Sequence, residues 1–352
     1  MHSIPVQSEA LSVEQGAARS TSGDSMLEIA DLEVAFETRM GHVKVVSDFS
    51  LSVARGECVG IVGESGAGKT QALLAVMGLL PRGARVSGSA RLQGEELLGR
   101  GAGALDEFRG ARIAMIFQDP LTALTPHMRV GDQIAEVLVR HRRLSWSAGR
   151  ERALELLRAV HIADAERRLR QYPHELSGGM RQRVMIAMAL ACEPDVLIAD
   201  EPTTALDVTV QAQILALLAE LKRTRGMSLV LVTHDLGVIA GLADRVAVMY
   251  AGRLVEQGTA RAVLKAPRHP YTRALLDSMP RLDVPSSEPL RAIRGQPPDP
   301  RALPAGCAFH PRCDLAADLC RSARPRLRPT GDGMVACHRP LGAAAGEEGP
   351  TS

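Results

Sequence analysis

The sequence lacks any apolar stretch long enough to cross a bilayer. Its longest apolar runs, "ALLAVMGLL" (residues 72–80) and "VMIAMALAC" (residues 184–192), reach about half the length of a membrane-spanning helix. The N-terminus also lacks the basic start and apolar core of a secretory signal, so we expect a disordered leader over residues 1–25. These absences predict a chain that does not span a membrane and that stays in the cytoplasm.

A large excess of charge of either sign is also missing. The chain has 42 Lys and Arg against 40 Asp and Glu, for a net charge of +2. A surface that follows nucleic-acid phosphates normally carries a strongly basic balance or a Lys/Arg stripe. We therefore expect no nucleic-acid partner, and the 45% apolar and 23% charged composition is that of an ordinary globular protein.

Cysteine is scarce and unevenly placed. Cys58 and Cys192 stand in apolar surroundings and are expected to be core thiols, whereas four others gather near the end: Cys307, Cys313, Cys320 and Cys337. A reducing compartment disfavours disulfides, which leaves a metal as the leading explanation for this group. Zinc sites usually contain close C-x₂₋₄-C pairs, and none occurs here, so the looser spacing favours an iron–sulfur cluster. Zinc and unligated thiols remain alternatives, with His310 and His338 as possible substitute ligands.

The chain divides into two parts by composition. Residues 26–264 alternate strand-like and helix-like runs, which predicts an α/β sheet with flanking helices, and a helical insertion interrupts it over about 121–180. Fourteen of the 21 prolines fall in residues 265–352. That density disfavours long helices and central strands and predicts a loop-rich appendage that needs an external staple.

One glycine-rich loop has the form of a phosphate cradle. "GESGAGKT" follows the apolar strand "ECVGIV" and opens a helical run, which is the context of a Walker A loop rather than of an ordinary turn with an exposed lysine. Backbone N–H groups and the helix start would surround a β-phosphate, Lys69 would reach the β and γ oxygens, and Thr70 would bind Mg²⁺. The residues expected to contact the nucleotide are Gly63, Glu64, Ser65, Gly66, Ala67, Gly68, Lys69, Thr70 and Gln71.

Two carboxylates follow a second apolar strand in "VLIADEP". Asp200 is placed to hold the magnesium ion, and Glu201 is placed to polarise a water for attack on the γ-phosphate. A solvated acidic loop is the alternative, and the phosphate cradle makes it the weaker one. The stretch "LSGGMRQR" (residues 176–183) offers a second anion site. Ser177 can cap a helix there, and the first residues of that helix, Gly178 and Gly179, expose backbone N–H groups.

These motifs, in this order, resemble the ATP-binding subunit of an ABC transporter over about residues 26–264. The resemblance adds the Q-loop glutamine Gln118 in "IFQDP", the D-loop Asp207 in "TALD" and the switch histidine His234 in "LVTHD". It implies an ABC-type P-loop ATPase domain with a RecA-like core, an antiparallel β-subdomain and a helical subdomain. It further implies that the second glycine loop closes over the γ-phosphate held by a partner domain.

The same resemblance assigns the remaining roles. Thr70, Gln118 and Asp200 would hold Mg²⁺, and Asp207 would contact the partner across the dimer. His234 would brace the γ-phosphate and the attacking water. The adenine would stack on Phe36, unless Met40 occupies that position.

Longer stretches, such as "YPHELSGGMRQRVMIAMAL" and "APRHPYTRALL", resemble the bacterial oligopeptide and dipeptide permease ATPases, a subfamily that nickel importers share; Thr125 departs from its usual Asn. The resemblance implies a second homologous ATPase, two transmembrane permease subunits, an external solute-binding protein acting indirectly, and a peripheral place on the cytoplasmic face of the bacterial membrane. Some of these ATPases carry a [4Fe–4S] cluster in the same tail.

A soluble ABC ATPase that clamps nucleic acid is the hypothesis from another class. Translation types carry two such domains in one chain, and repair types carry long coiled-coil or zinc insertions, neither of which this sequence has. A degenerate, inactive partner subunit is disfavoured by the intact Glu201.

Overall fold

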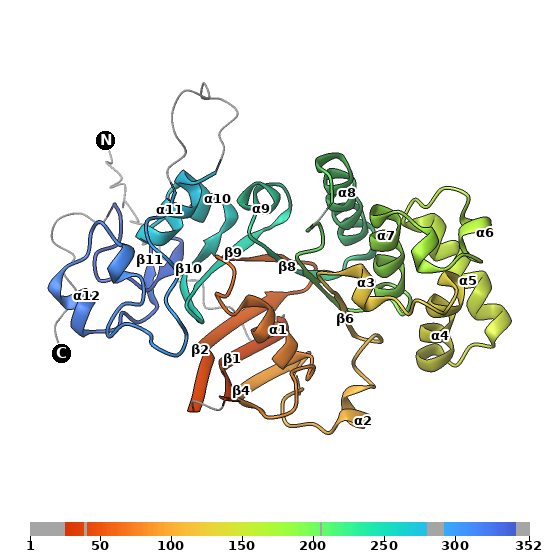
Figure 1. Ribbon diagram of the computed structural model, residues 1–352, viewed down its shortest axis with the longest axis horizontal. Helices are drawn as coiled ribbons and strands as arrows, with labels where there is room; N and C mark the ends of the chain where they lie inside the picture. Colours follow the sequence, from red (N-terminus) through yellow and green to blue (C-terminus); the bar gives the residue numbers. More distant parts are fainter. Residues whose placement is uncertain (1–24, 39–40, 205, 280–291, 343–352) are drawn as a thin grey trace, which may run out of the picture.

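A computed structural model of the protein describes residues 25–38, 41–204, 206–279 and 292–342. The predicted leader, apart from Ser25, and the alternative adenine contact Met40 lie outside these ranges. Two sheets organise the chain (Figure 1). The larger one has the order β11-β12-β10-β9-β3-β8-β7-β6, and its strands are β3 (Cys58–Val62), β6 (Ile113–Ile116), β7 (Val196–Asp200), β8 (Ser228–Thr233), β9 (Arg245–Tyr250), β10 (Arg253–Thr259), β11 (Arg328–Thr330) and β12 (Gly333–Val335).

The five strands from β9 to β6 run parallel, and their sequences are almost entirely apolar. Strands of this kind are buried on both faces because helices or a second sheet cover each side. Alternate residues accordingly enter two different hydrophobic cores: in β8, Val230 and Val232 face one core, and Leu229 and Leu231 face the other. No helix among the described residues is long and apolar enough to cross a membrane.

The first core lies between the large sheet and a smaller antiparallel sheet. That sheet has the order β2-β1-β4-β5, with β1 (Ser25–Thr38), β2 (Gly41–Ala54), β4 (Ala84–Leu92) and β5 (Glu95–Glu96). Helix α1 (Lys69–Val76) packs into the same core through Ala72, Leu73 and Val76, and the short α2 (Ala102–Leu105) adds Leu105. The antiparallel sheet and α1 lie together below the large sheet in Figure 1.

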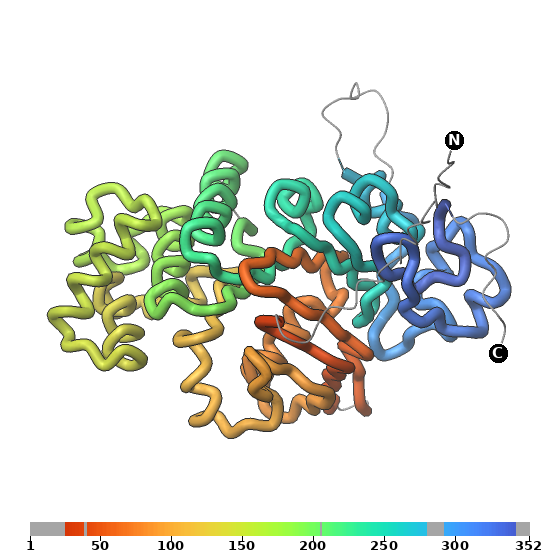
Figure 2. The backbone as a smooth tube through the Cα atoms, turned by 180° about the vertical axis from the view of Figure 1, so that it is seen from behind, coloured from red at the N-terminus to blue at the C-terminus, as the bar shows by residue number. Residues whose placement is uncertain are grey.

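The second core is covered by helices. Most of these helices form a helical lobe, which Figure 2 shows at the end of the molecule away from the C-terminal part. The lobe consists of α3 (Pro120–Ala123), α4 (Val130–Arg142), α5 (Trp146–Ala159), α6 (Ala165–Arg168), η1 (Pro173–Glu175) and α7 (Gly178–Ala189). Helices α8 (Val208–Arg225) and α9 (Leu236–Leu242) continue this layer. Helix α8 buries Ile214, Leu217, Leu218 and Leu221, which repeat with helical period, and Val210 is half-buried; Gly226 ends the helix with φ +62°.

The C-terminal part is attached to the sheet more closely than its composition predicts. β12 pairs with β10 and β11 pairs with β12, so this part extends the large sheet, with Pro329 on the edge strand where its missing N–H is tolerated. Its helices are short: α10 (Ala260–Lys265), α11 (Pro270–Asp277), η2 (His310–Arg312) and α12 (Asp318–Ser322). Phe309 packs against Tyr250 at the end of β9, so the chain supplies attachments of its own.

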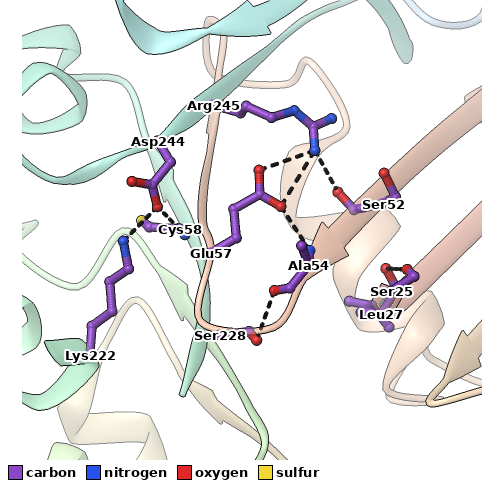
Figure 3. Close-up of polar contacts among 10 residues, drawn as sticks. All are labelled: Ser25, Leu27, Ser52, Ala54, Glu57, Cys58, Lys222, Ser228, Asp244 and Arg245. Carbon is purple, nitrogen blue, oxygen red and sulfur yellow. Dashed lines mark hydrogen bonds and ion pairs between the residues drawn. The ribbon is translucent and has the colours of Figure 1, made fainter. Parts of the chain in front are cut away.

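A polar network joins the two sheets where β2 turns into β3 (Figure 3). The Glu57 carboxylate accepts hydrogen bonds from the Ala54 N–H at 2.7 Å and from Arg245 at 3.1 Å. The hydroxyl of Ser228, which is fully buried at the start of β8, donates to the Ala54 carbonyl and accepts from the Gly56 N–H, both at 3.0 Å. The turn is thereby fixed to the central strands.

We expect Ser228→Ala to lower the free energy of unfolding by about 1–2 kcal/mol, because the turn loses both hydrogen bonds that one buried hydroxyl makes. Chemical denaturation of the purified protein measures the change. Ser52→Ala is the matched control, since Ser52 contributes its backbone carbonyl to Arg245 and keeps it in the variant. Equal stability of the Ser228 and Ser52 variants would contradict the prediction.

Candidate functional site

Four neighbouring parallel strands deliver polar residues to one edge of the large sheet. β3 leads into the phosphate loop (residues 63–70), β6 leads to Gln118, β7 ends at Asp200, and β8 is followed by His234. Because the carboxyl ends of parallel strands meet at one edge, residues more than 160 positions apart in sequence form a single site there.

The phosphate loop is tightly folded around the amine of Lys69. Its Nζ donates to the carbonyl oxygens of Gly63 at 2.8 Å and Glu64 at 3.1 Å. Lys69 is 5% exposed, and burial lowers the pKa of its amine. Gly68 has φ +96°, and a Cβ there would lie 2.7 Å from the Val45 carbonyl oxygen, so the position requires glycine.

The other predicted loop residues surround this centre. Ser65 and Gly66 are exposed at the tip of the loop, whereas Ala67 is buried and its N–H donates to the Glu64 carbonyl at 3.1 Å. Gln71, in the first turn of α1, has a buried Oε1 without a hydrogen-bond partner among the described residues. The loop therefore presents its exposed backbone directly in front of the α1 N-terminus, which is the arrangement that favours an anion.

The predicted magnesium ligands meet beside the loop. The Thr70 hydroxyl donates to Asp200 Oδ1 at 3.1 Å, which joins α1 to the end of β7. Asp200 is 3% exposed, and burial raises the pKa of its carboxyl, although the Thr70 hydrogen bond opposes that shift. A hydroxyl and a carboxylate are the oxygen ligands that Mg²⁺ takes, so these two residues fit the ion.

Glu201 is held in an uncommon backbone conformation, with φ +45°. Its Oε2 accepts hydrogen bonds from Gln118 Nε2 at 3.0 Å and from Thr204 Oγ1 at 2.9 Å. His234 Nδ1 lies 3.6 Å from the same oxygen. The structure thus brings together Gln118, Glu201 and His234 as a group, and it adds Thr204, which the sequence analysis did not select.

The second glycine loop is built as expected but lies apart from this group. Ser177 caps α7, and its hydroxyl accepts from the Met180 N–H at 3.4 Å. A Cβ on Gly179 would lie 2.7 Å from Val210 Cγ1, so glycine permits the contact between α7 and α8. In the described part of the chain, no hydrogen bond or ion pair links this loop to the phosphate loop. Asp207 caps α8 by accepting from the Val210 N–H at 2.9 Å.

The candidate adenine contact is a strand residue. Phe36 lies near the end of β1, where it pairs with Val43 of β2 and Ala84 of β4. Its side chain is half-buried against the first hydrophobic core. The assignment of Phe36 as the residue that stacks on adenine stays a prediction.

The four C-terminal cysteines line one cavity, together with His269, Phe309 and His310. Burial raises the pKa values of the Cys307, Cys313 and Cys337 thiols, that of Cys337 to about 12. In the described residues, no group of three or more His, Cys, Asp or Glu side chains is arranged to hold a metal ion. His310 Nδ1 and His338 Nε2 each lie 2.9 Å from a backbone carbonyl oxygen, so each of these nitrogens already makes a hydrogen bond within the C-terminal part.

Two residues from the C-terminal part reach the phosphate loop. The Tyr271 hydroxyl accepts from the Glu64 N–H at 2.8 Å, and Arg312 donates to both Glu64 carboxylate oxygens, at 2.7 and 3.0 Å. Sequence analysis missed both contacts. The residues stand in "HPYTR" and "HPRC", which carry no signal for phosphate binding, and only the resemblance to permease ATPases drew attention to the first stretch.

Comparison with known families gives two matches. Residues 46–204 match the ABC transporter family, and residues 255–320 match the C-terminal region of oligopeptide/dipeptide transporters. The first match includes the phosphate loop, Gln118, the second glycine loop, Glu201 and Thr204, and it ends before His234. The second includes three of the four C-terminal cysteines and Arg312.

Curated relatives match along most of their length. The chain is 50% identical to the oligopeptide transport ATP-binding protein OppD of Escherichia coli, over 90% of this chain and 94% of the relative. It is 49% identical to the dipeptide transport ATP-binding protein DppD of Bacillus subtilis, over 86% of this chain and 90% of the relative.

A solved structure with the same fold is the dimeric post-hydrolysis state of the ATP-binding cassette MJ0796 bound to ADP and Pi. It has a TM-score of 0.61 and 28% identity, and it covers 67% of this chain and 99% of that one. The fold, the grouped side chains at the strand ends and these matches agree with one another: the chain is an ATPase of the ABC transporter family and belongs to the ATP-binding subunits of its oligopeptide/dipeptide branch.

Proposed function

We propose that this chain hydrolyses ATP to power a bacterial importer of oligopeptides or dipeptides. The observation that carries the proposal is the meeting of the phosphate loop, the Thr70–Asp200 pair and Glu201 at one sheet edge. The relatives named for peptide transport match the chain through its C-terminal part as well as through its ATPase domain. The transported molecule would contact other subunits.

In the mechanism we propose, Lys69 transfers its donors from the loop carbonyls to the β and γ oxygens of ATP. Thr70 and Asp200, assisted by Gln118, would hold Mg²⁺, which would supply positive charge to neutralise the phosphates. The Glu201 carboxylate then accepts a proton from the attacking water, while His234 braces the γ-phosphate. Three neighbours point at Glu201 Oε2, so the other carboxylate oxygen keeps its lone pairs for that water.

The second glycine loop completes the site of a partner subunit. Ser177, Gly178 and Gly179 present helix N-terminal N–H groups, yet they are not part of the chain's own phosphate site. A head-to-tail pair of ATPase subunits would place this loop on the partner's γ-phosphate, with Asp207 at the junction. ATP binding then closes the pair and hydrolysis reopens it, which supplies the work for transport.

We expect Lys69→Ala to weaken ATP binding about 10- to 100-fold, since the variant loses charge-assisted hydrogen bonds to phosphate that are worth about 1.5–3 kcal/mol. Titration with a fluorescent ATP analogue measures the affinity. Lys265→Ala, which removes an exposed lysine at the end of α10, is the control. Unchanged affinity in the Lys69 variant would argue against the phosphate role.

Glu201→Gln should bind ATP normally but lose about 100-fold or more in turnover, because the amide cannot accept the proton. In the presence of the partner ATPase, the variant should accumulate as an ATP-bound closed pair, which size-exclusion chromatography with retained nucleotide detects. Normal turnover would overturn the general-base assignment.

The helical lobe is the proposed contact with the membrane subunits. Phe117 and Leu121, which lie on either side of Gln118 in sequence, are 36% and 60% exposed, and Trp146 at the start of α5 is 45% exposed. Exposed apolar side chains beside Gln118 suit a site where a short helix of a permease subunit docks. The assembly we propose has a homologous second ATPase, two permease subunits and an external solute-binding protein, and it places this chain peripherally on the cytoplasmic face of the membrane.

For the C-terminal module (residues 265–352) we propose a [4Fe–4S] cluster held by its four cysteines, with zinc as the alternative. The shared cavity and the mutual influence of the thiols on their pKa values support the set. Tetrahedral zinc needs four sulfurs at about 2.3 Å from one ion. Zinc sites usually contain a close C-x₂₋₄-C pair, and the spacing of these four cysteines includes none, so it favours a cluster over zinc.

Cys313→Ser should abolish a brown absorbance near ~400 nm in anaerobically purified protein, because a cluster ligand is lost. Iron, sulfide and zinc analysis of the same samples identifies the metal. Cys192→Ala, which removes a buried thiol outside the cavity, should keep the absorbance. Stoichiometric zinc without iron in the wild type would show that the cluster assignment is wrong.

A further inference from the structure

One ion pair connects the C-terminal module to the phosphate loop across 248 residues of sequence. Arg312 donates to both oxygens of the Glu64 carboxylate, and its side chain is 5% exposed. Its Nε donates to the Arg294 carbonyl at 2.8 Å, and a terminal nitrogen lies 3.3 Å from the Tyr250 hydroxyl. A bidentate pair that is shielded and anchored in this way is held in one geometry and is screened less by solvent than an exposed surface pair.

Glu64 is fixed through each of its polar groups by a different element. Its N–H donates to the Tyr271 hydroxyl of α11, its carbonyl accepts from Lys69 of α1, and its carboxylate accepts from Arg312 of η2. Glu64 directly follows Gly63, where the chain leaves β3. The entrance of the phosphate loop is therefore held from the C-terminal module as well as from the ATPase core.

Arg312 is rigidly tied to the cysteine cavity. It is the last residue of η2 and immediately precedes Cys313, which lines the cavity. Phe309, one turn earlier, packs on Tyr250 and Tyr271 at centroid distances of 5.3 Å each. A displacement of η2 would thus reach Glu64 by two routes, through Arg312 and through the Tyr271 hydroxyl.

We propose that Arg312 is a positioning residue for nucleotide binding, through which the C-terminal module sets the affinity of the phosphate loop. It acts in two ways. Geometrically, the pair holds the Glu64 peptide so that the loop needs no rearrangement to receive phosphate. Electrostatically, the guanidinium neutralises a carboxylate in the phosphate loop that would otherwise repel the ATP anion.

The first test is Arg312→Gln in the full-length chain, assembled with its partner ATPase. The dissociation constant for ATP is expected to rise about tenfold, with KM following it and kcat at saturating ATP staying within about twofold, because the reacting groups at Glu201 are untouched. Arg301→Gln is the matched control: Arg301 is an exposed arginine of the same module that pairs with Asp299. It should leave the dissociation constant unchanged.

The second test separates the specific pair from a general disturbance of the module. Removing both charges with Glu64→Gln/Arg312→Gln relieves the unpaired carboxylate, so the effect of Arg312→Gln should shrink to about threefold or less in the Glu64→Gln background. Arg312→Lys, which keeps the charge but loses the bidentate geometry, should fall between the wild type and Arg312→Gln. Thermal unfolding of each variant reports whether the module stays folded.

Three results would overturn the proposal. The first is an unchanged dissociation constant in Arg312→Gln. The second is a loss of kcat with ATP affinity preserved. The third is an equal weakening by Arg312→Gln with and without Glu64→Gln, which would mean that the variant disturbs the module without acting through Glu64. Because wild-type ATP binding is measured in the same series, failure of the proposal is distinguishable from failure of the ATPase itself.

Discussion

The structure depends on the parallel pairing of β3, β8, β7 and β6 in the centre of the large sheet. Each strand is short and buried, so its register is fixed by side chains that enter two separate cores. A shift of one residue in β7 would turn Asp200 to the opposite face of the sheet and end its contact with Thr70. The chemistry at the strand ends therefore rests on apolar packing several residues away.

Much of the fold and of the site is predictable because its signals are local. The strand, glycine loop and helix of the phosphate cradle are contiguous, and the apolar face of α8 repeats with helical period until Gly226 ends it. Parallel strands then bring the Glu201 group together whatever the loops between them contain. Thr204 was missed because it stands in "TALD", where the resemblance assigns a role to Asp207 alone.

The C-terminal contacts were not predictable for a different reason. The proline content correctly indicates short helices, but strand pairing by β12 depends on three residues, "GMV", which carry no distinctive pattern. Glu64 and Arg312 are ordinary surface residue types when they are considered separately. Their partnership exists because β9, α11 and η2 converge on the loop, and only the tertiary structure contains that information.

Two parts of the site, the backbone at Glu201 and the phosphate loop at Glu64, are held in place by hydrogen bonds from neighbouring side chains. Glu201 has a backbone conformation that costs about 1–3 kcal/mol for most residues, and hydrogen bonds from Gln118 and Thr204 hold it there. The phosphate loop is held through the polar groups of Glu64. In both cases at least one supporting side chain comes from an element distant in sequence: Gln118 for Glu201, and Tyr271 and Arg312 for Glu64. The geometry is therefore in place without nucleotide. Preorganisation of this kind means that binding energy need not be used to shape the loop, and it leaves that energy available for the closure of the subunit pair that we propose.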